Sequence, residues 1–190
     1  MATDYVFISS TKAYDMAYEL GKKVKESGFI PDCLVGISRG GLSIVRTLSD
    51  FFGIKNIYVI RVMYYDDIKT TKKEPKLIQD VDETFLKNKK VLVVDDVSDT
   101  GGSLIFTANL MKQKGIKEFK IATLHYKPWS KFKPDFYIDE TDKWIIYPWE
   151  VGETIRLIMK RDMTREEKMK ELRKTGIPTE MIKRYVDKFE

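Results

Sequence analysis

The segment from Val91 to Ser103, with the sequence VLVVDDVSDTGGS, constrains the fold of this chain most strongly. Its four leading apolar residues form the continuous hydrophobic run of a strand that is buried on both faces. Asp95 and Asp96 follow where we expect that strand to end, and a loop of hydroxyl residues and glycines then leads into a helical pattern. A buried strand, a polar loop and a helix in this order are typical of an open parallel sheet, in which ligands bind at the carboxyl ends of the strands.

The loop after this strand predicts a site for a sugar phosphate. Gly101 and Gly102 let the backbone approach a phosphate closely, and the free N–H groups at the start of the following helix attract its charge. The two adjacent carboxylates can accept hydrogen bonds from neighbouring hydroxyls of a sugar. A diol next to a phosphate indicates ribose 5-phosphate as the ligand.

Two other interpretations of the acidic pair stay open at this point. The pair is also compatible with an acidic turn after an ordinary core strand. Together with Asp99 it spells DDxxD, the metal motif of prenyl-transferring enzymes, in which the acids project from a helix. The β-branched valines before the pair and the glycines after it disfavour a helix at this position.

The rest of the chain alternates between strand and helix patterns, which is typical of an α/β sheet. We expect a first helix, capped by Ser10 or Thr11 and running to about Ser27, whose apolar face is Tyr14, Ala17, Leu20 and Val24. Besides the Val91 strand, the expected strands are Asp32–Ile37, Ile57–Met63, Phe119–Tyr126, Phe136–Ile138 and Trp144–Tyr147, and a helix is expected at Leu42–Phe52.

The composition fits a small globular protein with one main domain, residues 1–160, and a C-terminal helical extension, residues 161–190. Cys33 is the only cysteine and no export signal is evident, so we expect no disulfide framework and a cytoplasmic location. The single histidine, His125, excludes a histidine-rich zinc site. No apolar run approaches membrane-spanning length, and the scattered lysines behind the net charge of +5 indicate a solvated basic surface.

The C-terminal extension carries helix signals and no chemistry that we can assign. Thr164 and Glu167 predict a capping box, and Gly176 separates two helical patterns. The second pattern has an apolar stripe that must be buried against the body or another subunit, formed by Ile177, Met181, Ile182, Tyr185, Val186 and Phe189.

The order of strand, acid pair, hydroxyl–glycine loop and helix resembles the signature of the type I phosphoribosyltransferases, which use phosphoribosyl pyrophosphate (PRPP). The resemblance implies an α/β fold with a twisted, mainly parallel sheet flanked by helices, and a small hood. It implies that Asp95 and Asp96 bind the ribose hydroxyls and help to hold Mg²⁺, and that Asp99 is the catalytic group that accepts the proton from N7 of the base. The PRPP-binding residues implied in this segment are Asp95, Asp96, Ser98, Asp99, Thr100, Gly101, Gly102 and Ser103.

A second motif, SRGG at Ser38–Gly41, follows the expected strand Asp32–Ile37. The guanidinium of Arg39 matches the geometry of phosphate oxygens. Alone, such a motif is equally compatible with a plain loop. It resembles the family's pyrophosphate loop, which implies that Ser38, Arg39 and Gly40 bind PRPP and that the Ser38–Arg39 peptide is cis.

The polar segment Tyr64–Gln79 lacks apolar periodicity and predicts a loop. It falls where the family has a mobile loop that closes over the reacting centre and excludes water. Lys69, Lys72 and Lys73 would then approach the pyrophosphate, although each is equally compatible with a solvated loop.

Two further segments, HYKPWS and WIIYPWE, are candidates for binding the acceptor. Resemblance to xanthine–guanine-type enzymes implies that Lys127 donates to the 6-oxygen of a purine, that Trp144 covers its ring and that Ile145 supplies backbone contacts. Taken singly, the aromatic residues Trp144, Tyr147 and Trp149 are more typical of a protein core. Ile146 and Tyr147 depart from the family pattern, because polar residues are expected at their positions.

These resemblances imply a purine phosphoribosyltransferase that acts on hypoxanthine, guanine or xanthine in purine salvage. Its partners would be Mg²⁺ as cofactor, PRPP, the base, the nucleoside 5′-monophosphate and pyrophosphate, and it would form a homodimer or homotetramer. Transfer to adenine is the alternative, and a PRPP-sensing regulator that binds nucleic acid is a further one. The presence of Asp99, Lys127 and Trp144 favours the enzyme, so we do not expect nucleic acid or a membrane as a partner.

Overall fold

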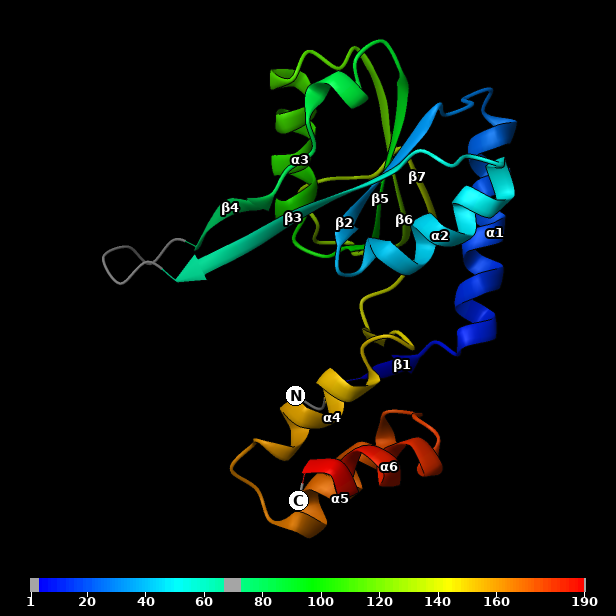
Figure 1. Ribbon diagram of the computed structural model, residues 1–190. Coiled ribbons are helices and arrows are strands. Elements are labelled where there is room, and N and C mark those ends of the chain that lie inside the picture. Colours follow the sequence, from blue (N-terminus) through cyan, green and yellow to red (C-terminus); the bar gives the residue numbers. More distant parts are fainter. Residues whose placement is uncertain (1–3, 67–72, 190) are drawn as a thin grey trace. The chain divides into compact units, whose positions relative to one another are not determined.

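The structure is a computed structural model that describes residues 4–66 and 73–189. It contains two compact units, one formed by Tyr14–Thr141 and the other by the segments Met1–Ala13 and Asp142–Glu190. The chain passes between the units within helix α1 (Ser10–Glu26) and again after Thr141. Each unit has its own sheet, so we describe them separately (Figure 1).

The larger unit is built on a six-stranded sheet with the strand order β4-β3-β2-β5-β6-β7. All neighbouring strands are parallel except β4, which is antiparallel to β3. This confirms the mainly parallel α/β sheet predicted from the sequence. The strands are β2 (Cys33–Ser38), β3 (Ile57–Asp66), β4 (Lys73–Gln79), β5 (Lys90–Ser98), β6 (Glu118–Tyr126) and β7 (Phe136–Glu140).

The chain reverses its direction of travel across this sheet between β2 and β5. From β2 it first adds β3 on one side and then returns to place β5 on the other, where Gly36 pairs with Val94. The crevice at such a reversal, beyond the carboxyl ends of the strands, is where ligands bind in open α/β sheets. The two motifs singled out in the sequence include the carboxyl ends of β2 and β5, so the topology brings both to the crevice at this reversal.

Helices cover both faces of this sheet (Figure 1). On one face lie α1, from Tyr14 on, and α2 (Gly41–Phe52); on the other lies α3 (Gly102–Gln113). Because side chains alternate along a strand, Val35 and Val93 pack with Leu104 and Met111 on the α3 face. The remaining short element, the 3-10 helix η1 (Glu83–Phe85), precedes β5.

Two expected boundaries are wrong. Strand β5 extends to Ser98, because its pairing with β6 continues that far, and the acidic pair therefore lies inside the strand. The segment Tyr64–Gln79, expected as a loop, is largely a hairpin of β3 and β4, which is held by backbone pairing and needs no apolar period. Lys69 and Lys72 lie outside the described residues, and Lys73 begins β4.

The buried face of α1 also differs in one position. Met16, Ala17, Leu20 and Val24 are buried as the helical period requires, but Tyr14 is 54% exposed. Successive helix positions are about 100° apart, which places Tyr14 beside the apolar stripe.

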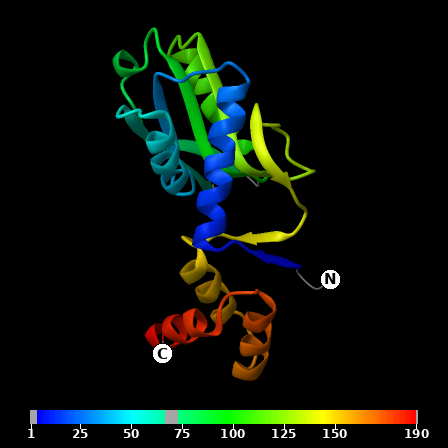
Figure 2. The ribbon, with the colours of Figure 1, turned by 90° about the vertical axis from the view of Figure 1, so that its right-hand side faces the viewer.

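The smaller unit joins both ends of the chain. Strand β1 (Tyr5–Phe7) pairs in parallel with β8 (Trp144–Ile146), as Figure 2 shows. Three helices follow β8: α4 (Val151–Met159), α5 (Arg165–Lys174) and α6 (Thr179–Phe189). The predicted capping box of Thr164 and Glu167 is present at the start of α5. Their shared core is Ile146, Val151, Ile155, Ile158, Leu172, Ile177, Ile182 and Val186, so most of the predicted stripe is buried within this unit. Across the described parts of both units, no helix is long and apolar enough to traverse a lipid bilayer.

Candidate active site

The loop after β2 lies directly against the carboxyl-terminal half of strand β5. A side chain at Gly40 would collide with the carboxylate of Asp96, and one at Gly41 would collide with the carbonyl oxygen of Val94. Only glycine permits this approach, which brings the start of α2 next to the acidic pair. The Ser38–Arg39 peptide is cis, as the resemblance implied, and Arg39 is exposed at the end of β2.

The two acids of β5 have different surroundings. Asp96 is 6% exposed, whereas Asp95 is half-buried and accepts a hydrogen bond on Oδ1 from the backbone N–H of Asp96 at 3.0 Å. Carboxylate oxygens are the hard ligands that Mg²⁺ prefers, and Mg²⁺ in enzymes is commonly held by one or two carboxylates together with substrate phosphates. Within residues 4–66 and 73–189, no three His, Cys, Asp or Glu side chains gather into a site that could hold a metal. The adjacent carboxylates of Asp95 and Asp96 fit a metal that takes its other ligands from a substrate.

The loop between β5 and α3 is shaped by glycine. Gly101 has φ +81°, and an added side chain would lie 2.6 Å from the backbone nitrogen of Phe132. The N-terminus of α3, at Gly102, presents the N–H groups of a first helical turn and the positive end of the helix dipole, and the N–H of Gly102 donates to the Thr100 hydroxyl at 3.4 Å. The hydroxyl of Tyr64, on β3, lies against Gly102, so a second donor faces the same point. This arrangement suits a phosphate group.

Hydrogen bonds join residues after β6 to the end of β5 and to the loop between β5 and α3. The hydroxyl of Ser98 lies 2.8 Å from that of Ser130 and donates to the carbonyl oxygen of Phe132 at 2.7 Å. The backbone N–H of Lys131 donates to the carbonyl oxygen of Thr100 at 3.2 Å. Ser98 is buried, so its hydroxyl serves this connection between two loops in the structure.

Lys127 follows β6 directly, as predicted, and its backbone N–H donates to the carbonyl oxygen of Ser98 at 3.0 Å. The side chain is 5% exposed, with Nζ 5.3 Å from the centre of the Trp129 ring. The indole N–H of Trp129 donates to Oδ1 of Asp99 at 3.1 Å. The structure thus brings Asp99 and Lys127 to the same aromatic side chain.

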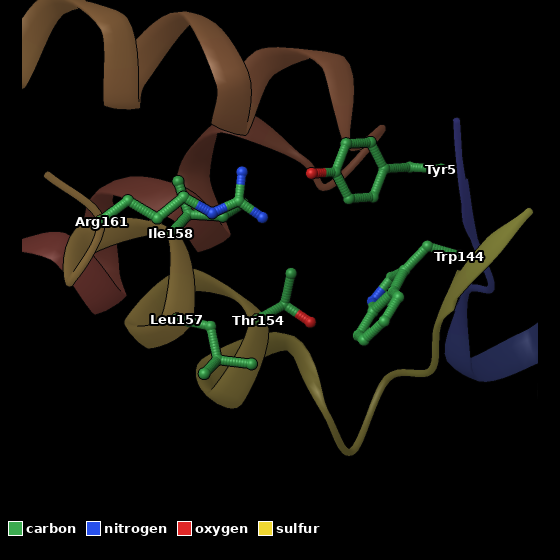
Figure 3. Close-up of a pocket in the computed structure, with 6 residues that line it drawn as sticks. All are labelled: Tyr5, Trp144, Thr154, Leu157, Ile158 and Arg161. Carbon is green, nitrogen blue, oxygen red and sulfur yellow. The ribbon is translucent and has the colours of Figure 1, made fainter. Parts of the chain in front are cut away.

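Trp144 belongs to the smaller unit, where it lines a cavity of about 280 Å³ (Figure 3). Its ring and that of Tyr5 form one side, and Arg161 extends its guanidinium toward the Tyr5 hydroxyl from the other. Thr154, Leu157 and Ile158 of α4 complete the lining. The Tyr5 hydroxyl donates to Glu171 at 2.8 Å; burial and then this bond raise the pKa of Tyr5.

The neighbours of Trp144 are core residues. Ile145 is 8%, Ile146 0% and Tyr147 1% exposed, and the Tyr147 ring stacks on Trp149 with centroids 5.0 Å apart. Ile146 and Tyr147 therefore pack inside their own unit, which accounts for apolar and aromatic residues where polar ones were expected.

Sequence reasoning missed Tyr64, Trp129, Ser130 and Phe132 as parts of this site. Trp129 and Ser130 stand in the quoted HYKPWS segment, and Tyr64 begins the segment that was expected to close over the reacting centre, but no contact was predicted for any of them. Phe132 lies outside these segments and reaches the loop between β5 and α3 from the loop after β6.

Fold and loops together define an open α/β protein with a crevice at the reversal of its sheet, the place where such proteins bind ligands. A family model described as the phosphoribosyl transferase domain matches residues 11–156. The chain therefore belongs to the phosphoribosyltransferase family, whose members are enzymes of the glycosyltransferase type.

Individual relatives agree with this assignment. The structure of a purine phosphoribosyltransferase from Pyrococcus horikoshii is similar with a TM-score of 0.70 and 37% identity, over 77% of this chain and 95% of that one. A xanthine-guanine phosphoribosyltransferase from Gluconobacter oxydans is 29% identical over 121 residues, which are 63% of this chain and 68% of that protein. A ribose-phosphate pyrophosphokinase from Thermoplasma acidophilum is 31% identical over 94 residues, but these span only 30% of its length.

Proposed function

We propose that this enzyme is a purine phosphoribosyltransferase that transfers 5-phosphoribose from Mg²⁺-bound PRPP to a 6-oxopurine. The observation that carries the proposal is the contact of the Ser38–Gly41 loop with Asp96 at the adjacent ends of β2 and β5. The names of its relatives, which include purine and xanthine-guanine phosphoribosyltransferases, support a purine as acceptor.

In this proposal the two loops divide the substrate between them. The N–H groups at the start of α3, together with Thr100 and Ser103, bind the 5′-phosphate, and Asp95 and Asp96 accept hydrogen bonds from the ribose hydroxyls. Arg39 binds the pyrophosphate through its guanidinium fork. Asp95 or Asp96 would hold Mg²⁺ together with phosphate oxygens of the substrate, and the metal would supply positive charge to offset that of the pyrophosphate.

The transfer step needs a proton acceptor near the base. As the bond between C1 and the pyrophosphate oxygen breaks, pyrophosphate leaves with the bonding electrons and a ring nitrogen of the base bonds to C1. Positive charge that develops on the ribose is stabilised by fixed carboxylates nearby. Asp99 accepts the proton that leaves N7, which restores a neutral purine ring.

Lys127, Trp144 and Ile145 are the proposed base-binding residues. An ammonium group donates hydrogen bonds and cannot accept one, so Lys127 favours a 6-oxygen over the 6-amino group of adenine. Stacking of a base on an aromatic ring contributes about 1–3 kcal/mol in nucleic-acid complexes, which is the contribution we expect from Trp144. Ile146 is buried in the core, and its carbonyl oxygen accepts from the backbone N–H of Ile8 at 2.9 Å.

Steady-state rates with hypoxanthine, guanine, xanthine and adenine, for the wild type and Lys127→Ala, test this function. We expect the wild type to prefer a 6-oxopurine and the variant to lose that preference, because a mismatched buried charge costs about 1–3 kcal/mol. Lys131→Ala is the matched control, because that exposed lysine lies in the same loop. A wild-type preference for adenine that Lys127→Ala leaves unchanged would show that the acceptor is adenine. Size-exclusion chromatography tests the homodimer or homotetramer that we propose.

A further inference from the structure

We propose that Trp129 is a positioning residue that fixes the carboxylate of Asp99 and the ammonium of Lys127 in one arrangement for transfer to the base. This inference rests on the proposed function, because it uses the roles assigned there to both partners. It adds a third member, whose indole contacts both of the others.

The edge of the indole holds one oxygen of Asp99. Asp99 is exposed in the loop between β5 and α3, where its side chain would otherwise sample several rotamers. The indole N–H is a donor only, and it donates to Oδ1 at 3.1 Å. This bond to Oδ1 restricts the rotation of the carboxylate before the base arrives and leaves Oδ2 to accept the proton in the proposed step.

The face of the same ring holds Lys127. Nζ lies 5.3 Å from the ring centre, within the distance at which the electron-rich face of tryptophan attracts a cation. Because the ring is rigid and planar, the position of its N–H edge and the position of its face are not independent. Trp129 therefore fixes the position of the Asp99 carboxylate relative to that of the Lys127 ammonium group.

The loop that carries Trp129 is anchored on both sides. The backbone N–H of Ser130 donates to the carbonyl oxygen of Lys127 at 2.9 Å, and its hydroxyl lies 2.8 Å from that of Ser98. Lys131 is bonded to Thr100, next to Asp99. These bonds hold the loop of Trp129 against the loop of Asp99, as positioning requires.

Packing does not account for a tryptophan here. The residue is 54% exposed, so burial accounts for only part of its surface. The exposed indole stands instead between two groups with proposed roles in the reaction.

Trp129→Phe and Trp129→Leu separate the two contacts. Phenylalanine keeps an aromatic face and loses the N–H, so we expect kcat to fall about tenfold, the size of one charge-assisted hydrogen bond, with unchanged KM values and thermal midpoint. Leucine loses the face as well, so KM for the base should also rise. Tyr14→Phe is the control, because it removes a donor from an aromatic side chain that is equally exposed, 54%, on α1, and it should leave kcat unchanged.

A double-mutant cycle with Asp99→Asn distinguishes failure of this inference from failure of the proposed function. We expect Asp99→Asn to reduce kcat strongly and Trp129→Phe to add no further loss in that background. Independent, multiplying losses would overturn the positioning role, as would wild-type kinetics of Trp129→Phe beside an impaired Asp99→Asn. Full turnover by Asp99→Asn would instead refute the proposed role of Asp99, and the inference with it. If Trp129→Phe lowers the thermal midpoint, the cycle is measured below that midpoint and decides in the same way.

Discussion

Two features of its surroundings support the pyrophosphate-binding role that we propose for Arg39. It follows a cis peptide at the end of β2, and the glycine after it lies against Asp96. Its side chain is exposed at the reversal of the sheet, where a ligand has access.

Arg39→Ala should raise KM for PRPP more than KM for the base. The loss of a charge-assisted contact corresponds to roughly tenfold or more in affinity. Arg46→Ala is the matched control, since Arg46 is exposed on α2 with an ion pair to Asp50 at 4.0 Å. Equal changes in both KM values would contradict a pyrophosphate role.

Burial of Cys33 raises the pKa of its thiol to about 11 from an ordinary value of 9.0. The folded protein should therefore resist a thiol reagent at pH 8, because the thiolate is the reactive form, and should react once denatured. The stability effect has a definite sign: between about pH 9 and 11 only the unfolded thiol ionises, so this group lowers stability as pH rises through that window. Rapid labelling of folded protein at pH 8 would contradict the burial.

For individual residues, the sequence predicts which of them share a site when they belong to one continuous segment. Asp95, Asp96 and the hydroxyl–glycine loop are contiguous, so their neighbourhood is fixed locally. Tyr64 reaches the site from β3 and Trp129 from the loop after β6, and their contacts depend on sheet order and on loop conformation. A single sequence does not encode such contacts in any local pattern.

Among the elements, the turn between β5 and α3 is the most demanding. Gly101 combines a left-handed backbone with close approach to the loop after β6. The continuous apolar runs of β2 and β5 were predictable because both strands are covered on both faces. The antiparallel pair of β3 and β4 was not predictable, because its strands carry polar residues and are held together by backbone hydrogen bonds.

Gly101→Ala should lower the free energy of unfolding and the activity together. A left-handed alanine costs about 1–2 kcal/mol, and the collision with Phe132 adds to that cost. Gly115→Ala is the matched control, because Gly115 has φ +70° and no atom within 4 Å of an added side chain. Chemical denaturation of both variants measures the difference, and equal losses would contradict the proposed contact between the two loops.

For the whole molecule, we retain the proposal of a phosphoribosyltransferase domain at residues 1–160 with a helical extension at 161–190. The extension is tied into the smaller unit, since Leu172 and Ile182 share a core with Ile155 and Ile158 of α4. We therefore assign it a structural contribution and no chemistry.

Removal of residues 161–190 should destabilise the smaller unit. Fully burying an isoleucine side chain contributes about 1.5–3 kcal/mol, and truncation would expose Ile155 and Ile158 together. We expect a lower thermal midpoint and a higher KM for the base, because Trp144 lies in that unit. A truncated protein with the original midpoint would show that the extension is dispensable.

Formation of nucleoside monophosphate and pyrophosphate from Mg²⁺, PRPP and a 6-oxopurine tests the central claim most directly. The wild type should release both products in equal amounts. The double variant Asp95→Asn with Asp96→Asn should lose nearly all turnover while keeping its thermal midpoint, because it removes the charges that bind ribose and metal without removing packing volume. Near-normal turnover by the folded double variant, or no product from the wild type with any purine, would contradict the assignment of this site.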